Sequence, residues 1–234
     1  MKYVKAIIFG CLAALAAAQM TKESILLAME DSSKTMAKLD SKFTLIVQGG
    51  AVNVILGNRE ETGDMDFLAT NYKPMDPSAY GEVLDKLKRG WLWAYTQAKK
   101  RQQPIPSNWV DTSISIFFNR KEALFKKFTS EAEAQATILS TAGMDKDGTG
   151  IKFIAAPWDW QFVSKMVQHE KDYDLDDATF YLQQWLKKVE TSSISYDRIA
   201  QWFSAWSFTV PSDLAALCKE INRKGGAQLI TGNF

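Results

Sequence analysis

The residues best suited to chemistry are a glycine pair, Gly49 and Gly50, and two aspartates, Asp64 and Asp66. The glycines close an apolar, β-branched run at residues 43–47, which predicts a buried strand that ends in a tight turn. Backbone N–H groups at such a turn can approach an anion closely, and the start of a following helix adds about half a positive charge. The pair therefore predicts a phosphate-binding turn.

Asp64 and Asp66 are two residues apart in a predicted strand over residues 64–68. Because strand side chains alternate between faces, both carboxylates are expected on one face, with Met65 and Phe67 facing the core. Two carboxylates on one face can share a pair of divalent ions about 4 Å apart. Mg²⁺ is the expected cofactor, since it prefers oxygen ligands completed by substrate phosphates and water. Either motif alone is more often a plain turn or a solvated strand face, and the specificity lies in their order and spacing.

The segment that contains these motifs also resembles a known family. The run from Gly49 to Phe67 resembles the opening of minimal nucleotidyltransferases of the polymerase-beta superfamily, especially AbiEii-like toxins and related uncharacterised fungal proteins. The resemblance covers residues 42–186. It implies a magnesium-dependent transfer of a nucleoside monophosphate from a nucleoside triphosphate to a hydroxyl or phosphate acceptor, which would be a protein, a tRNA end or a small molecule. The residues that carry the resemblance and would bind nucleotide or metal are Gly49, Gly50, Asn53, Arg59, Thr62, Asp64 and Asp66.

Asp111 is the candidate third carboxylate that the resemblance implies. It precedes a predicted strand over residues 113–118, and it would hold metal or take the proton from an attacking hydroxyl. Its position after Pro106 and Asn108 equally favours a loop-capping role, because aspartate is common in turns. Both interpretations remain open from the sequence.

Lys165, Asp177, Arg59 and Thr62 complete the candidate site. Lys165 lies in a segment similar to the helix that carries an active-site lysine in the family, although an isolated lysine more often faces solvent. Asp177 lies in an acidic segment that either begins a helix, with Asp174 or Asp176 as N-cap, or places Asp177 across the cleft from the metals. Arg59 and Thr62 would either steady the strand of Asp64 or contact phosphate.

The first eighteen residues have the order of a secretory signal peptide. Lys2 and Lys5 form a basic start, an apolar run covers residues 6–18, and Ala16 and Ala18 fit a small-residue cleavage site. The run is too short to span a bilayer comfortably, so no membrane anchor is expected. The protein is therefore expected to be secreted, or cytoplasmic if Met20 is the start. The alternative for residues 1–18 is an alanine-rich core helix.

Composition describes an ordinary globular chain. The 234 residues carry a formal charge of +1 and 46% apolar side chains, without repeats. This balance argues against broad nucleic-acid binding, which needs clustered cations. The local cluster at Lys99, Lys100 and Arg101 is expected to be solvated surface, since no aromatic residue interrupts it. After removal of residues 1–18 only Cys218 would remain, so no internal disulfide is expected.

The predicted fold is α+β, a small mixed sheet flanked by helices with a helical C-terminal subdomain. The expected division is a signal peptide at residues 1–18, a nucleotidyltransferase-like core at residues 19–190 and the helical subdomain at residues 191–234. Helices are predicted over residues 22–38, 51–56, 77–90, 131–140 and 178–188, and one more between Pro211 and Gly225.

A second interpretation is a secreted, non-catalytic interaction protein that retains the nucleotidyltransferase fold. An arginine that the family carries near the acidic segment has no counterpart here, where His169, Glu170 and Lys171 stand instead. Both interpretations predict the same fold and differ in whether Asp64 and Asp66 support transfer.

Overall fold

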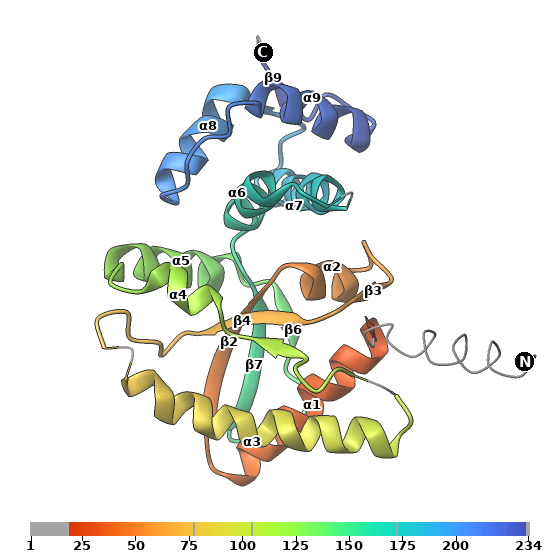
Figure 1. Ribbon diagram of the computed structural model, residues 1–234, viewed down its shortest axis with the longest axis vertical. Helices are drawn as coiled ribbons and strands as arrows, with labels where there is room; N and C mark the ends of the chain where they lie inside the picture. The colour runs from red at the N-terminus through yellow and green to blue at the C-terminus, as the bar shows by residue number, and fades with distance from the viewer. Residues whose placement is uncertain (1–18, 77, 104, 172, 233–234) are drawn as a thin grey trace, which may run out of the picture.

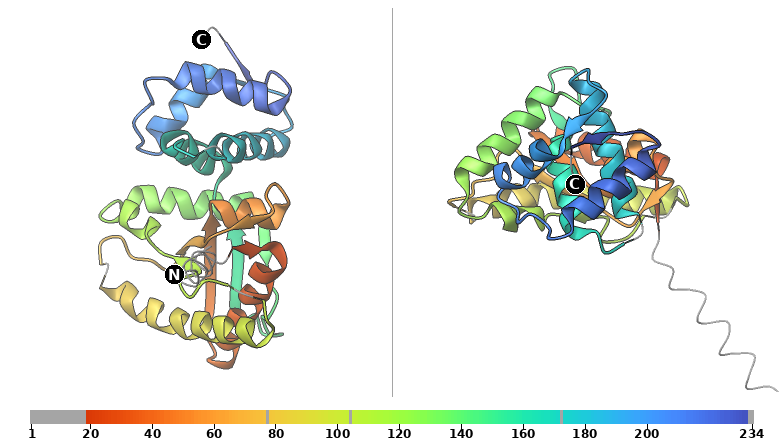
Figure 2. Two further views of the ribbon diagram at one scale, coloured as in Figure 1. Left: turned by 45° about the vertical axis from the view of Figure 1, so that its right-hand side comes forward. Right: turned by 90° about the horizontal axis from the view of Figure 1, so that it is seen from above.

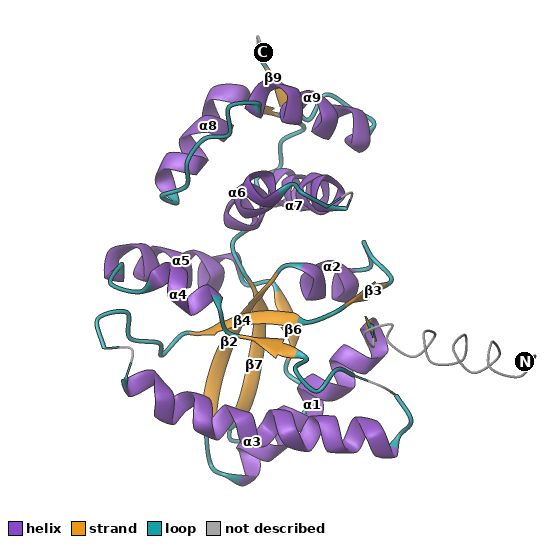
Figure 3. Ribbon diagram, viewed as in Figure 1, coloured by secondary structure: helices purple, strands orange, loops and turns teal. Residues whose placement is uncertain are grey.

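The computed structural model describes residues 19–232, apart from residues 77, 104 and 172. The expected signal peptide lies outside the described residues. The described chain is a mixed α+β structure in which a sheet carries helices on both faces and a helical layer covers one end (Figures 1 and 3).

The centre is a five-stranded mixed sheet with the order β5-β4-β2-β7-β6. The central strand β2 runs antiparallel to β4 and parallel to β7, while the edge strand β5 runs parallel to β4 and β6 antiparallel to β7. Its strands are β2 (Lys42–Gln48), β4 (Met65–Ala69), β5 (Val110–Asp111), β6 (Ile138–Ser140) and β7 (Gly150–Ala155). Two short pairs lie outside this sheet, namely β1 (Met20–Thr21) with β3 (Glu61–Thr62), and β8 (Ile194–Ser195) with β9 (Ile230–Thr231).

Helices of the first two thirds of the chain flank the sheet. They are α1 (Lys22–Lys38), α2 (Gly50–Leu56), α3 (Ala79–Lys100), α4 (Ile114–Phe118) and α5 (Glu122–Gln135). A second group, α6 (Trp158–Gln168), α7 (Asp174–Lys188), α8 (Tyr196–Ala205) and α9 (Leu214–Gly225), forms the helical layer at one end (Figure 2). Because α6 packs on α8 and α7 on α9, the expected boundary at residue 191 falls inside this layer, which begins with α6.

Several predicted elements are confirmed. The helix over residues 22–38 is α1, and its N-cap Thr21 accepts from the Ser24 N–H. The short helix after the glycine pair is α2, which ends at Gly57 in the left-handed conformation. Met65 and Phe67 are fully buried, as expected from strand alternation. The last helix ends with Gly226 in the left-handed conformation.

Two predicted elements are wrong, and a third is longer than its predicted range. Residues 114–118 form a helix rather than a strand, because Ile114 and Phe118 are buried one turn apart while Ile116 is 75% exposed. The predicted helix over residues 77–90 extends to Lys100, since Trp91, Ala94 and Ala98 continue its buried stripe. The predicted helix over residues 131–140 ends early at Gln135, where Ala136 turns left-handed and the chain enters β6.

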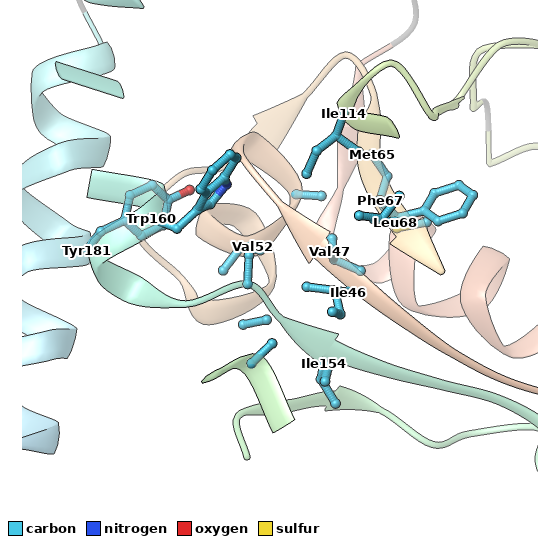
Figure 4. Close-up of a cluster of buried hydrophobic side chains, with 14 of the residues drawn as sticks. Ile46, Val47, Val52, Met65, Phe67, Leu68, Ile114, Ile154, Trp160 and Tyr181 are labelled. Atoms are coloured by element: carbon cyan, nitrogen blue, oxygen red, sulfur yellow. The ribbon is translucent and has the colours of Figure 1, made fainter. Parts of the chain in front are cut away.

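One part of the continuous core lies between the sheet and α2, where the site begins. Figure 4 shows apolar side chains from β2, β4 and β7 grouped with Val52 of α2. Ile46, Val47, Phe67 and Ile154 are each at most 1% exposed. Truncating a buried phenylalanine such as Phe67 to alanine costs about 3–5 kcal/mol, so this packing holds the strand ends firmly in place.

Candidate active site at the glycine turn

A cleft of about 1080 Å³ lies where the end of the sheet meets the helical layer. Its walls come from the turn between β2 and α2, the segment from Arg59 to Asp66, the start of α4, and α6 with the segment that follows it. Residues far apart in sequence therefore share one cavity, and most of the predicted site residues line it.

Both the backbone conformation at position 49 and the nearby Asp66 side chain favour glycine there. Its φ of +70° is one that residues with a Cβ rarely adopt, and a Cβ there would stand 3.0 Å from Asp66 Oδ2. Its N–H donates to Gln161 Oε1 at 3.1 Å, and its carbonyl oxygen accepts from the Tyr181 hydroxyl at 2.8 Å. The Gly49 N–H is therefore bonded within the protein, whereas the sequence predicted that it would be a donor to phosphate.

Gly50 begins α2 and lines the cleft. A Cβ at Gly50 would collide with the Thr62 hydroxyl and lie 3.4 Å from Arg59 Nη1. Thr62 in turn donates to the Asp64 carbonyl oxygen at 3.3 Å. Gly50 thus lets Thr62 and Arg59 pack against the turn, and Thr62 steadies the segment that carries Asp64.

Three aspartates lie near one another at the start of β4 and β5, and two of them line the cleft. Asp66 lies in β4, and Asp111 is its in-register neighbour on the parallel strand β5. Asp64 is exposed and comes directly before β4. Asp64 and Asp66 line the cleft, whereas one oxygen of Asp111 accepts from the Ser113 N–H at 2.5 Å. Asp111 therefore caps the turn before α4 and also lies beside Asp66.

The pKa of Asp66 is affected by its burial and by the two neighbouring aspartates. Burial, followed by the charges of Asp64 and Asp111, raises the pKa of Asp66 to about 7, and Lys165 acts in the opposite direction. A carboxyl group in this environment is only partly ionised at neutral pH. A cation placed beside it would offset the repulsion from the other two aspartates.

The oxygen ligands offered by Asp64 and Asp66 suit Mg²⁺, which commonly takes one or two carboxylates and completes its shell with water and substrate phosphates. Within residues 19–232, excluding the three gaps, no group of three or more His, Cys, Asp or Glu side chains is arranged to hold a metal ion.

Cationic side chains form the opposite wall. Lys165 Nζ lies 2.8 Å from Asp174 Oδ1 and 3.1 Å from Asp177 Oδ2. Arg59 Nη1 lies 3.2 Å from the same Asp177 oxygen, and its guanidinium stacks 4.1 Å from the centroid of the Tyr173 ring. Lys165, Arg59 and Tyr173 all line the cleft. The buried pair of acids thus holds Lys165 and Arg59 in place, and Lys165 lies near enough to Asp66 to act against the rise in its pKa.

Asn53 and Asp177 do not line the cleft but support residues that do. Asn53 is fully buried, where its side-chain amide donates to the Tyr181 hydroxyl and accepts from Asn58 Nδ2 at 3.0 Å. Asp177 is also fully buried, and burial is the main cause that raises its pKa. Its Oδ1 has no hydrogen-bond partner among the described residues. The predicted N-cap of α7 is also different, since Tyr173 occupies that position and Asp174 is the first helical residue.

Sequence reasoning missed Gln161, Tyr181 and Tyr173. Gln161 also donates to the Ala156 carbonyl oxygen at 3.0 Å, so it holds the end of β7 as well as the glycine turn. Its signal was available, because it is a polar residue inside the apolar run from Trp158 to Val163. Tyr181 and Tyr173 gave no such signal, since their partners are more than a hundred residues away.

An aromatic group closes another side of the cleft. The rings of Phe117 and Phe208 stack with centroids 5.1 Å apart, and Trp160 packs against both. Trp160 Nε1 donates to Gln48 Oε1 at 2.8 Å, which ties α6 to the end of β2. The three rings connect α4 of the sheet region to the helical layer.

Comparison of the chain with protein-family models, with curated proteins and with solved structures finds no match. Among the described helices, none combines the length and the apolar character needed to cross a membrane.

Proposed function

We propose that the protein is a magnesium-dependent nucleotidyltransferase that moves a nucleoside monophosphate from a nucleoside triphosphate to a hydroxyl or phosphate acceptor. The observation that carries this proposal is the in-register pair of Asp66 and Asp111 beside Asp64, at a glycine turn and opposite Lys165. Carboxylates facing cations across a cleft provide separate places for metal and for phosphate oxygens.

The chain's own residues have distinct parts in this proposal. Asp64 and Asp66 would hold Mg²⁺, which when bound supplies charge neutralisation at the phosphates. Lys165 and Arg59 present fixed positive charge to the triphosphate from the far wall, because Asp174 and Asp177 restrain them. Asp111, the in-register neighbour of Asp66, would accept a proton from an acceptor hydroxyl, while its Oδ1 keeps the Ser113 N–H.

A non-catalytic interaction protein remains the second candidate. Lys165 is already paired with two acids, and this observation favours the second candidate. Secretion, the toxin-like activity and the identity of the acceptor are further parts of the proposal.

The decisive experiment incubates the full chain with Mg²⁺ and each of the four labelled nucleoside triphosphates, and measures pyrophosphate release. The double variant Asp64→Asn, Asp66→Asn is expected to lose activity by about a hundredfold or more. The matched control is Asp145→Asn with Asp147→Asn, which removes two aspartates at the same spacing from an exposed turn.

The control variant is expected to keep full activity. Absence of pyrophosphate release with every nucleotide, together with no nucleotide-dependent rise in melting temperature, would favour the interaction protein. Equal loss in both variants would show that the aspartates act through folding instead of through the site.

A further inference from the structure

The outer face of α3 carries an exposed apolar pair inside a cluster of cations. Leu92 is 67% exposed and Trp93 is 43% exposed, although the opposite face of the same helix is buried through Leu87, Trp91 and Ala94. Large apolar side chains side by side on an otherwise polar helix face mark a contact surface more often than a single exposed residue does.

The charges around this pair are unbalanced. The helix carries five cationic and two acidic side chains, and Lys88 is paired with Asp85 at 3.1 Å. Arg89, Lys99 and Lys100 form no ion pair with any described residue. Arg89 lies one turn before Trp93, and Lys100 Nζ lies 5.6 Å from the centroid of the Trp93 ring. Lys99, Lys100 and Arg101 are exposed, as expected from the sequence, but the helix also brings Trp93 and Tyr95 beside the two lysines.

We propose that the outer face of α3, defined by Arg89, Leu92, Trp93, Lys99 and Lys100, docks reversibly on an anionic membrane surface. Tryptophan is favoured at the boundary between headgroups and acyl chains, where leucine adds apolar contact. Lysine and arginine near the surface are attracted to anionic headgroups, while their stems lie along the apolar boundary. A helix lying on the membrane in this way is a surface contact and needs no spanning segment.

The shape of the face favours a membrane over a nucleic acid. Single-stranded nucleic acids follow a charged groove with stacking rings, whereas this face is the convex side of one helix. Neither the cleft at the glycine turn nor the apolar hollow beside α1 is lined by α3. Leu92, the more exposed of the two apolar residues, has no ring on which a base can stack.

The position of α3 is compatible with an accessible cleft. Figures 1 and 2 place α3 at the end of the molecule away from α6–α9, and the cleft lies beside α6. Docking through α3 would leave the helical layer on the far side from the lipid. The proposal does not depend on nucleotidyl transfer, and the two fail independently.

The test is co-sedimentation of the full chain with vesicles of phosphatidylcholine alone and with about 30% phosphatidylserine. Binding is expected to the anionic vesicles only and to weaken as salt rises. The variant Lys99→Gln, Lys100→Gln is expected to reduce partitioning about tenfold or more. Its matched control is Lys187→Gln, Lys188→Gln, which removes the same charge from the last turn of α7 and should bind as the natural chain does.

The contribution of the apolar residues Leu92 and Trp93 to vesicle binding is tested in the same assay. The variant Leu92→Ser, Trp93→Ser is expected to lose binding, whereas Ile116→Ser with Val189→Ser removes apolar residues of similar exposure elsewhere and should not. Equal binding to both vesicle types, equal loss in a control variant, or tight binding to a single-stranded oligonucleotide with no vesicle binding would each overturn the proposal. Unchanged melting temperatures of the variants exclude unfolding as the cause.

Discussion

The Tyr181 hydroxyl donates to the carbonyl oxygen of Gly49 at 2.8 Å, across 132 residues of sequence. The same hydroxyl accepts from the buried Asn53 amide, so a single side chain of α7 fixes both the turn and the helix that follows it. The glycine turn is therefore held from the helical layer as well as from the sheet.

Tyr181→Phe is expected to lower the free energy of unfolding by about 1–3 kcal/mol, because it leaves two buried polar groups short of a partner. Chemical denaturation measures this loss. Tyr95→Phe on α3, outside the site, serves as a comparison for loss of a hydroxyl, since phenylalanine keeps the ring that Lys99 contacts. A Tyr181→Phe protein as stable as the natural chain would show that the hydroxyl does not hold the turn.

Asp66→Asn is expected to stabilise the protein at high pH. The folded-state pKa of about 7 is above the ordinary value of 3.8, so the folded protein retains a proton that the unfolded chain releases between these values. Stability from this group is fully present below about pH 4 and is lost as pH rises through about 7. Asparagine cannot ionise, and the variant should gain up to about 4 kcal/mol at pH 8 and little near pH 4.

Thermal unfolding of Asp66→Asn and of the natural chain at a series of pH values checks this prediction. Asp147→Asn, in an exposed turn, is the comparison and should show no such pH-dependent gain. A constant difference in stability between Asp66→Asn and the natural chain across the series would contradict the crowding of the three aspartates.

Lys165→Met is expected to destabilise the fold by about 3–5 kcal/mol near neutral pH, because it leaves the buried acids Asp174 and Asp177 with one fewer cation. Adding Asp177→Asn to this variant should recover part of the loss, since one of the unpaired charges is then removed. Denaturant midpoints of the two single variants and the double variant give the coupling energy.

Lys171→Met is the matched comparison, because Lys171 also lines the cleft but is exposed and forms no ion pair with a described residue. Its stability should change by less than about 1 kcal/mol. A loss as large as that of Lys165→Met would contradict the specific role of the buried acids.

Gly49→Ala is expected to lower stability by about 1–2 kcal/mol through its positive φ, with a further cost from the nearby Asp66 carboxylate. Gly50→Ala should also destabilise, because its Cβ would displace Thr62. Gly81→Ala is the control, since this glycine of α3 has open space and an ordinary helical conformation. That change should stabilise by up to about 1 kcal/mol. Melting temperatures of the three variants rank the effects, and equal values would contradict the steric argument.

Local patterns in the sequence were enough to predict several parts of this protein. Residue alternation placed Met65 and Phe67 in the core and Asp64 and Asp66 near one another, and helical spacing predicted α1 and α2. These features depend on neighbours within one or two turns, where periodicity and capping residues carry enough information.

The composition of the site depends on contacts between distant parts of the chain. Residues 114–118 alternate like a strand, yet they form a helix because the ends of the segment are buried on one side by packing from distant elements. Register across β4 and β5 set Asp111 beside Asp66, and the packing of α6 and α7 against the glycine turn gave Gln161 and Tyr181 their partners. Such contacts join residues far apart in sequence, so no local pattern specifies them. Burial among those neighbours also sets the charge of Asp66, which residue type alone leaves undetermined.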